Sequence, residues 1–157
     1  LKFKPFGYLP IDSIFMKNSF NLSFETFPVG TKVYAYGYPL STILGDDIQV
    51  TDGMITKKTG IDGDITMYQI NAHIAEGSSG GPLFDGFGNL IGITSSGLRK
   101  EISSNINFAI KSSFIKPLID HLSFDIKIQN SNHLKELNLT EQIKRISENV
   151  VLIKVKN

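Results

Sequence analysis

The sequence predicts a mainly β fold: a small closed barrel of six antiparallel strands, a closing helix, and an appended helix and strand at the C-terminal end. Three observations indicate this fold. Over the first 125 or so residues, short runs of Val, Ile, Tyr, Phe and Thr alternate with clusters of Gly, Asp, Ser and Pro. Six such runs fall within about ninety residues. Finally, the chain has 157 residues, of which 41% are hydrophobic and 20% are charged. This length and this composition are typical of one soluble globular domain.

Each predicted strand is a short β-rich run bounded by turn residues. The six ranges are residues 31–38, 47–57, 65–74, 82–84, 90–94 and 106–110. Gly53 lies inside the second range and predicts a bulge or a sharp bend there, because glycine weakens a regular strand. The fourth and fifth ranges form a hairpin around residues 85–89, whose glycines and asparagine tolerate the positive φ of a tight reversal.

A helix is expected after the last strand, from Ser112 to Leu122, with Ser112 or Ser113 as its N-cap. Its apolar face would hold the side chains of Phe114, Ile115, Leu118, Ile119 and Leu122. The chain thus divides into residues 1–125, the barrel with its helix, and residues 126–157, a tail with a helix over 140–148 and a strand over 150–155. A lone apolar strand needs a partner, so we expect it to fold back on the barrel or to pair with a second chain.

Composition excludes several kinds of site and partner. The chain has no cysteine, which rules out disulfides, a thiolate nucleophile and cysteine-ligated metals. The 16 basic and 15 acidic residues are scattered and nearly balanced, which argues against nucleic acid as a partner. His121 and His133 lie twelve residues apart without carboxylates at ligand spacing, so we expect no metal and no cofactor. No apolar run approaches the ~20 residues of a membrane span.

The string that carries chemistry is Gly77-Ser-Ser-Gly-Gly-Pro82. Small residues let backbone approach backbone closely, and a hydroxyl in such a turn, here that of Ser79, is where an acyl-transfer enzyme places its nucleophile. The same turn can aim the N–H groups of Gly77 and Ser79 at a developing oxyanion, worth roughly 3 to 4 kcal/mol per donor. From composition alone, a flexible loop without chemistry is the alternative. A phosphate-binding loop is excluded, because the glycine spacing differs and no Lys-Ser/Thr follows.

This string resembles the Gly-x-Ser-Gly-Gly-Pro signature of the chymotrypsin/trypsin superfamily, with Ser79 in the nucleophile position. Five further segments are similar, in order and spacing, to the bacterial Htr/Deg-type proteases; they are residues 36–39, 50–55, 69–74, 88–93 and 107–110. The resemblance runs from Val29 to Leu122 and implies the second barrel of that two-barrel fold. It also implies a serine endopeptidase that cuts peptide or protein substrates through an acyl-enzyme at Ser79, with the N–H groups of Gly77 and Ser79 as the oxyanion hole.

The resemblance assigns substrate-binding positions as well. Ser95, Ser96 and Gly97 would be the strand edge that pairs with the substrate backbone. His73, six residues before Ser79, would lie at the floor of the pocket for the side chain that precedes the cut bond. There it either donates a hydrogen bond to an acidic or amide side chain or is a hydrogen-bonded histidine of the barrel wall.

The chain departs from this family in one large respect. No histidine precedes His73, whereas these enzymes carry their His and Asp on a first barrel upstream. Because the sequence also begins at Leu1 rather than Met, we expect an excised piece whose missing N-terminal barrel supplies both residues, and which is inactive alone. One alternative is a catalytically inactive module that binds peptides or proteins along the predicted strand edge; another is a purely structural barrel. The resemblance favours an exported or periplasmic location.

The tail carries a second, shorter similarity. Residues 141–154 resemble the helix-to-strand opening of an Htr-type protease domain, although here they follow the barrel. The alternative is a plain C-terminal helix and strand that dock on the missing first barrel.

Overall fold

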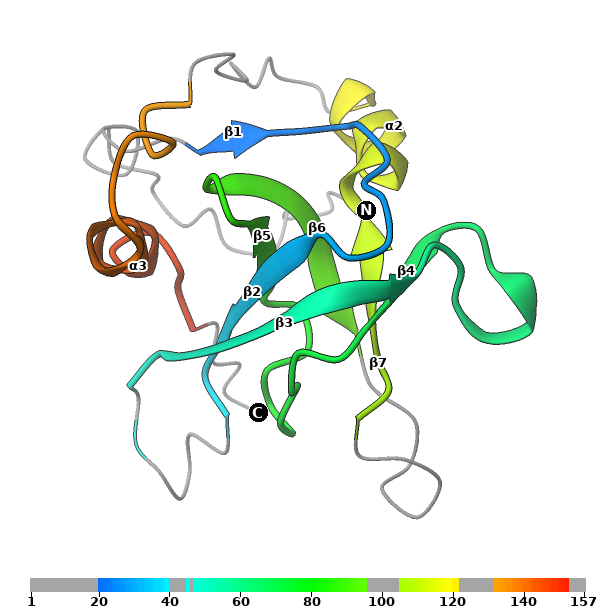
Figure 1. Cartoon of the computed structure of the whole chain (residues 1–157), viewed down its shortest axis with the longest axis horizontal. Coiled ribbons are helices and arrows are strands. Elements are labelled where there is room, and N and C mark those ends of the chain that lie inside the picture. The colour runs from blue at the N-terminus through cyan, green and yellow to red at the C-terminus, as the bar shows by residue number, and fades with distance from the viewer. Residues whose placement is uncertain (1–19, 40–44, 46, 96–104, 122–131, 153–157) are drawn as a thin grey trace, which may run out of the picture.

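The computed structural model describes residues 20–39, 45, 47–95, 105–121 and 132–152 (Figure 1). Its main body is a closed barrel of six strands; they are β2 (Lys32–Gly37), β3 (Gln49–Lys57), β4 (Met67–Ile70), β5 (Pro82–Asp85), β6 (Asn89–Ser95) and β7 (Asn107–Lys111). Neighbours pair in the order β6-β5-β2-β3-β4-β7, and pairing of β6 with β7 closes the ring. Every pairing within the ring is antiparallel, which confirms the predicted barrel.

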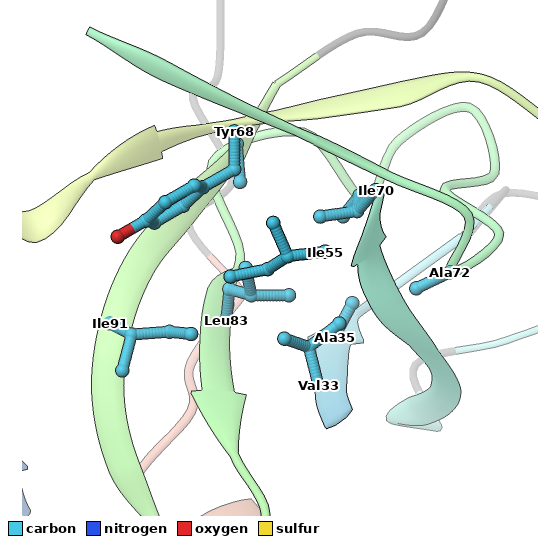
Figure 2. Packing of buried hydrophobic residues seen from close by; sticks show 9 residues of the cluster. Val33, Ala35, Ile55, Tyr68, Ile70, Ala72, Leu83 and Ile91 are labelled. Atoms are coloured by element: carbon cyan, nitrogen blue, oxygen red, sulfur yellow. The ribbon is translucent and has the colours of Figure 1, made fainter. Parts of the chain in front are cut away.

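Alternation of side chains along the strands builds the core. Val33 and Ala35 of β2 belong to the inner cluster, whereas Tyr34 and Tyr36 belong to a second cluster on the outer face of the same strand. The inner cluster draws on all six strands (Figure 2); its members are Val33, Ala35, Ile55, Tyr68, Ile70, Ala72, Leu83, Ile91 and Ala109. The Tyr68 hydroxyl is not left unpaired, because it accepts the N–H of Phe27 at 2.8 Å.

One short strand was not predicted. β1 (Asn21–Leu22) runs parallel to the start of β6, with Asn21 beside Asn89. The two asparagine side chains form a hydrogen bond of 2.7 Å. A strand of two residues is too short to show an alternation of apolar and polar residues in the sequence, so only its pairing with β6 reveals it.

Of the two possibilities predicted at Gly53, a bulge or a sharp bend, the bulge is not found there. Gly53 pairs with Val33 in regular register, and the irregularity of β3 lies between Ile55 and Lys57. Glycine is required at position 53 for another reason: a Cβ there would lie 2.4 Å from the backbone nitrogen of Ala72. The glycine therefore allows the chain that follows β4 to pass closely over β3.

The closing helix is shorter than predicted, and neither expected cap is present. A 3₁₀ turn, η3 (Ser112–Phe114), comes first, and α2 (Lys116–Asp120) follows with Ile115 as its N-cap. The Ser112 hydroxyl donates to the carbonyl of Ser23 instead, so Ser112 is fully buried against the segment that follows β1. Because the Ser112 hydroxyl is already bonded to the Ser23 carbonyl, it cannot cap the helix.

The apolar face predicted for that helix is also wrong in part. Phe114 is 40% exposed and Leu118 is 69% exposed, whereas Ile115 and Ile119 are half-buried. The 3₁₀ turn and the α-helix have different periods, so these residues do not share one helical stripe. Leu122, the fifth member of the face, lies outside the described residues.

The helix predicted in the tail is confirmed to within one residue at each end. α3 (Leu139–Ser147) begins after Asn138, whose side-chain oxygen accepts the Glu141 N–H at 3.0 Å as an N-cap. The helices of the described part are all too short or too polar to cross a membrane.

The tail packs against the barrel through α3 and the residues that precede it; the expectation of folding back or pairing with a second chain concerned the strand over 150–155 alone. Leu134 and Ile146 are 9% and 1% exposed, and they pack in the outer cluster with Tyr34, Tyr36 and Phe84. α3 consequently lies beside the β2 and β5 side of the barrel (Figure 1).

The strand predicted at residues 150–155 is absent from the described part of the tail. Residues 150–152 belong to no strand, and residues 153–155 lie outside the described residues. The amides of Asn149 and Val150 instead close the end of α3, donating to the carbonyls of Ile146 and Ser147 at 3.0 and 3.4 Å. The domain boundary predicted at residue 125 also falls outside the described residues.

Candidate active site

Ser79 lies in the loop of residues 75–81, here called the serine loop, which precedes β5. Two backbone hydrogen bonds join this loop to β6: the Gly80 N–H donates to the Thr94 carbonyl, and the Thr94 N–H donates to the Gly81 carbonyl, both at 2.8 Å. Inside the loop the Gly81 N–H donates to the Ser78 carbonyl at 3.2 Å. Gly80 and Gly81, which follow Ser79, are therefore bonded directly to β6, and Ser78, which precedes it, is bonded to Gly81.

The side chain of Thr94 adds a third contact between β6 and the loop. Its Oγ1 lies 2.8 Å from the Ser78 carbonyl oxygen and 3.0 Å from that of Gly81, so one hydroxyl proton serves two acceptors. Thr94 is only 2% exposed, which leaves little access for water to compete. This role of Thr94 could not be predicted from the sequence, because a threonine in an alternating strand gives no local sign of what its hydroxyl contacts.

The backbone conformation of the serine loop and its close packing against β2 require glycine at three positions. Gly77 and Gly80 have φ of 91° and 89°, in the left-handed region that glycine adopts without strain. A Cβ on Gly81 would lie 2.0 Å from the carbonyl oxygen of Tyr36 on β2. The conformation of the serine loop thus requires glycine at all three positions.

Ser79 and the amides beside it are open to the outside. Ser79 is exposed, and among the described residues neither the Gly77 N–H nor the Ser79 N–H has a hydrogen-bond acceptor. Both amides are therefore available to an acceptor that a ligand would bring. Their convergence on one point beside the Ser79 hydroxyl is still a prediction.

A cleft of about 490 Å³ opens beside Ser79. Residues 77–82 and the end of β2 line one part of it, and residues 149–152 of the tail line another. The Tyr38 hydroxyl connects the two, donating to the Val150 carbonyl at 2.7 Å. The contribution of Tyr38 and the tail to this cleft could not be predicted from the sequence, because Tyr38 and Val150 are 112 positions apart and no local pattern links them.

No base lines this cleft in the part of the chain that the structure describes. His73, His121 and His133 all lie outside its lining, as do all the acidic side chains described. The Nδ1 atom of His121 lies 2.6 Å from the carbonyl of Pro117 within α2. The described residues also contain no group of three His, Asp or Glu side chains that could hold a metal ion.

Of the predicted substrate-binding edge, the structure describes only Ser95. It is the half-buried last residue of β6 and pairs with Phe108 of β7. Ser96 and Gly97 lie outside the described residues. The role of this edge is therefore untested.

His73 is exposed and lines a second, much smaller cavity of about 10 Å³, room for about one water molecule. Gly37 and Ser78 line both this cavity and the cleft, so the two adjoin. The Thr51 hydroxyl donates to the His73 carbonyl at 2.7 Å, which attaches the backbone of His73 to β3. In this structure the cavity admits no substrate side chain, and a binding role for His73 is still a prediction.

One known protein family matches a part of the chain that includes both barrel strands and the serine loop. The family model described as a trypsin-like peptidase domain matches residues 16–93, a range that contains the entire serine loop. The chain is a trypsin-like domain related to the HtrA-type serine proteases. The family part of the sequence interpretation is thereby confirmed.

Several relatives of this trypsin-like domain carry protease names. It is 33% identical over 128 residues to the "Probable periplasmic serine endoprotease DegP-like" of Rickettsia prowazekii, an alignment covering 75% of this chain and 24% of that protein. It is 36% identical over 101 residues to the "Serine protease Do-like HtrB" of Bacillus subtilis, covering 59% and 22%. Among solved structures, the serine endoprotease from Yersinia pestis matches with a TM-score of 0.53 and 30% identity, covering 64% of this chain and 34% of that one. The domain thus spans about a quarter or less of the length of these curated relatives.

Proposed function

We propose that this chain is the serine-bearing half of a serine endopeptidase, which hydrolyses peptide bonds through an acyl-enzyme at Ser79. The observation that carries the proposal is an exposed Ser79 in a turn attached to β6, with the amides of Gly77 and Ser79 lacking an acceptor in the described part. Such a turn suits acyl transfer, because the nucleophile and the oxyanion donors belong to one rigid segment.

The proposed reaction has two stages. The Ser79 Oγ attacks the carbonyl carbon of the peptide bond while a histidine takes its proton, and the two amides stabilise the oxyanion. When the C–N bond breaks, the histidine gives the proton to the leaving amine, and an ester remains on Ser79. Water activated by the same histidine then attacks the ester, which frees the carboxylic acid product and restores the hydroxyl.

In this proposal a second barrel, outside the 157 residues, supplies the histidine and its aspartate. Two observations support this: no described residue that lines the cleft is a histidine or an acid, and the chain spans only 22% and 24% of two relatives named as serine proteases. A serine without a base stays protonated and is a poor nucleophile. The chain alone should therefore hydrolyse peptides no faster than its Ser79→Ala variant.

The proposal extends to the substrate backbone and to location. The edge that begins at Ser95 and continues through Ser96 and Gly97 would pair with the extended substrate, as a strand added to the barrel. One relative is described as periplasmic, which supports an exported or periplasmic location for this protein.

Labelling of the full-length protein with a serine-directed phosphonate tests the assignment. We expect the label on Ser79 by peptide mass mapping, and Ser79→Ala should remove both the label and turnover, with a loss on the order of 10⁶ in kcat. Ser113→Ala on η3, away from the cleft, is the control and should keep both. A label on another serine would contradict the proposal. A full-length protein that resists labelling and binds peptides equally well with and without the Ser79 hydroxyl would instead be the inactive binding module.

A further inference from the structure

The cleft beside Ser79 is built from two parts of the chain that are far apart in sequence. The serine loop and the end of β2 form one part, and residues 149–152, here called the tail wall, form the other. In Figure 1 the segment that follows α3 runs back toward β2, and residues 149–152 line the cleft together with the end of β2. A segment after the barrel therefore shapes the surroundings of the proposed nucleophile.

The first two residues of the tail wall, Asn149 and Val150, are held by contacts with α3 and with the barrel. Ile146 of α3 is buried in the outer cluster, and Val150 packs against the same cluster. The side-chain amide of Asn149 donates to the Arg145 carbonyl at 2.9 Å, and the Tyr38 hydroxyl donates to the Val150 carbonyl at 2.7 Å. These bonds and contacts attach the beginning of the wall to the folded domain.

The surface that lines the cleft is uncharged and largely apolar. None of the described residues that line it is Asp, Glu, Lys, Arg or His, and apolar surface comes from Phe20, Tyr38, Pro82, Val151 and Leu152. Val151 is 56% exposed, so its side chain is accessible rather than packed away. A volume of about 490 Å³ is in the range of sites that enclose small ligands or a few side chains.

We propose that the tail wall forms a subsite for an uncharged, apolar side chain of the peptide that reacts at Ser79. The peptide is the occupant because the wall and Ser79 line one continuous cleft. An apolar side chain gains by leaving water against this surface, whereas a charged side chain would lose hydration without a counter-charge. The identity of the occupant rests on the proposed function, but the apolar selectivity of the cleft can be measured without catalysis.

Thiol chemistry on the 157-residue chain provides that measurement. Because the chain has no cysteine, Ser79→Cys creates a single thiol in the cleft, and Thr140→Cys creates an exposed reference thiol on α3. Each is treated with methanethiosulfonates that carry a methyl, a benzyl, a cationic or an anionic group. We expect the benzyl-to-methyl rate ratio to be about five- to tenfold higher at position 79 than at position 140, from partial burial of the phenyl ring. Equal ratios at the two positions would overturn the subsite.

Val151→Asp, added to Ser79→Cys, tests whether the tail wall is the source of the selectivity. It should remove most of the benzyl preference and raise the cationic-to-anionic rate ratio by about twofold or more. Val29→Asp is the matched control, because Val29 is 57% exposed and does not line the cleft. Val151→Thr, which keeps the shape of the side chain, should remove part of the preference, and circular dichroism verifies that each variant is folded. A benzyl preference that survives both changes at Val151 would overturn the proposal.

The full-length protein separates this inference from the proposed function. If Ser79→Ala retains full activity, the proposed function fails, and with it the peptide as the occupant, whatever the thiol rates show. If Val151→Asp lowers kcat/KM for peptides with apolar side chains and spares or improves those with cationic ones, the subsite is supported. If it lowers the activity on all peptides equally, the wall contacts another barrel instead of substrate, and the subsite proposal is wrong.

Discussion

The amide of Gly80 donates a hydrogen bond to the carbonyl of Thr94 at 2.8 Å, so the residue directly after the proposed nucleophile is attached to barrel strand β6, near the end of that strand. Thr94 returns a second backbone bond to Gly81 and directs its hydroxyl toward the same loop. The position of Ser79 therefore depends on β6, which the rest of the barrel holds in place.

Thr94→Val tests this dependence. The change removes a buried hydroxyl from between two carbonyl oxygens while it keeps the size of the side chain, so we expect the free energy of unfolding to fall by about 1 kcal/mol. In the full-length protein it should also slow phosphonate labelling of Ser79. Urea unfolding and labelling rates measure the two effects. Thr94→Ser keeps the hydroxyl and should label at the normal rate; if Thr94→Val also labels normally, the hydroxyl does not position the loop.

Gly81→Ala should be one of the most damaging small substitutions in the chain. Its Cβ would overlap the Tyr36 carbonyl oxygen, which belongs to a barrel strand and cannot move aside cheaply. We expect a loss of about 3 kcal/mol or more in unfolding free energy, measured by urea denaturation. Gly86→Ala is the control, because a Cβ at Gly86 meets no atom within 4 Å and should change the stability little. Similar stabilities for the two variants would show that the loop can shift away from β2.

Ile146→Ala tests whether the tail and the barrel fold as one unit. Removing a side chain that is 1% exposed should leave a cavity in the outer cluster and cost about 2 to 4 kcal/mol in a single unfolding transition. Leu139→Ala, at a position 41% exposed on the same helix, should cost less than about 1 kcal/mol. A separate, earlier transition for the tail, with the barrel transition unmoved, would contradict this prediction.

Stability should decline at alkaline pH because of Tyr36. Burial raises the pKa of its phenol above the usual value of 10. The unfolded chain therefore loses this proton first, so the stabilisation is complete below about pH 10 and is lost as the pH rises toward the folded-state pKa. Tyr36→Phe should flatten the decline between about pH 10 and pH 12 in urea unfolding experiments. An unchanged decline in the variant would exclude Tyr36 as a cause.

His73 should influence which side chain the full-length enzyme accepts before the cut bond. If its side chain lines the pocket before the cut bond, the full-length enzyme should prefer Glu or Gln there, and His73→Ala should lower kcat/KM for those peptides more than for apolar ones. For this to hold, the small cavity beside Ser78 must widen when substrate binds. A peptide-library profile that the mutation leaves unchanged would assign His73 to the barrel wall.

The sequence predicted the barrel well because its strands alternate over several residues, and Val33 and Ala35 do separate from Tyr34 and Tyr36 as the period requires. It failed where a contact from elsewhere decides the local structure. Ser112 bonds to Ser23 rather than to the helix it was expected to cap.

The same limit applies to the candidate site. The serine loop was found because its residues are consecutive, and a string of small residues around a hydroxyl can be read directly. Thr94 and Tyr38 were not found, because each acts on a segment that is distant in sequence and packs against it only in the folded chain. A position that matters through a hydrogen bond to a remote carbonyl leaves no pattern around itself.

The hydrogen bond between Tyr38 and Val150 also has a consequence for the order in which the protein assembles during synthesis. The six strands are all complete by Lys111, so the ring and the serine loop can form while the tail is still inside the ribosome. Until α3 emerges, Tyr34, Tyr36 and Phe84 lack the cover that Leu134, Ile143 and Ile146 provide, and this exposed part is a surface for chaperones or for aggregation. The cleft beside Ser79 thus acquires its second side only after residues 149–152 have been made, later than the ring and the serine loop.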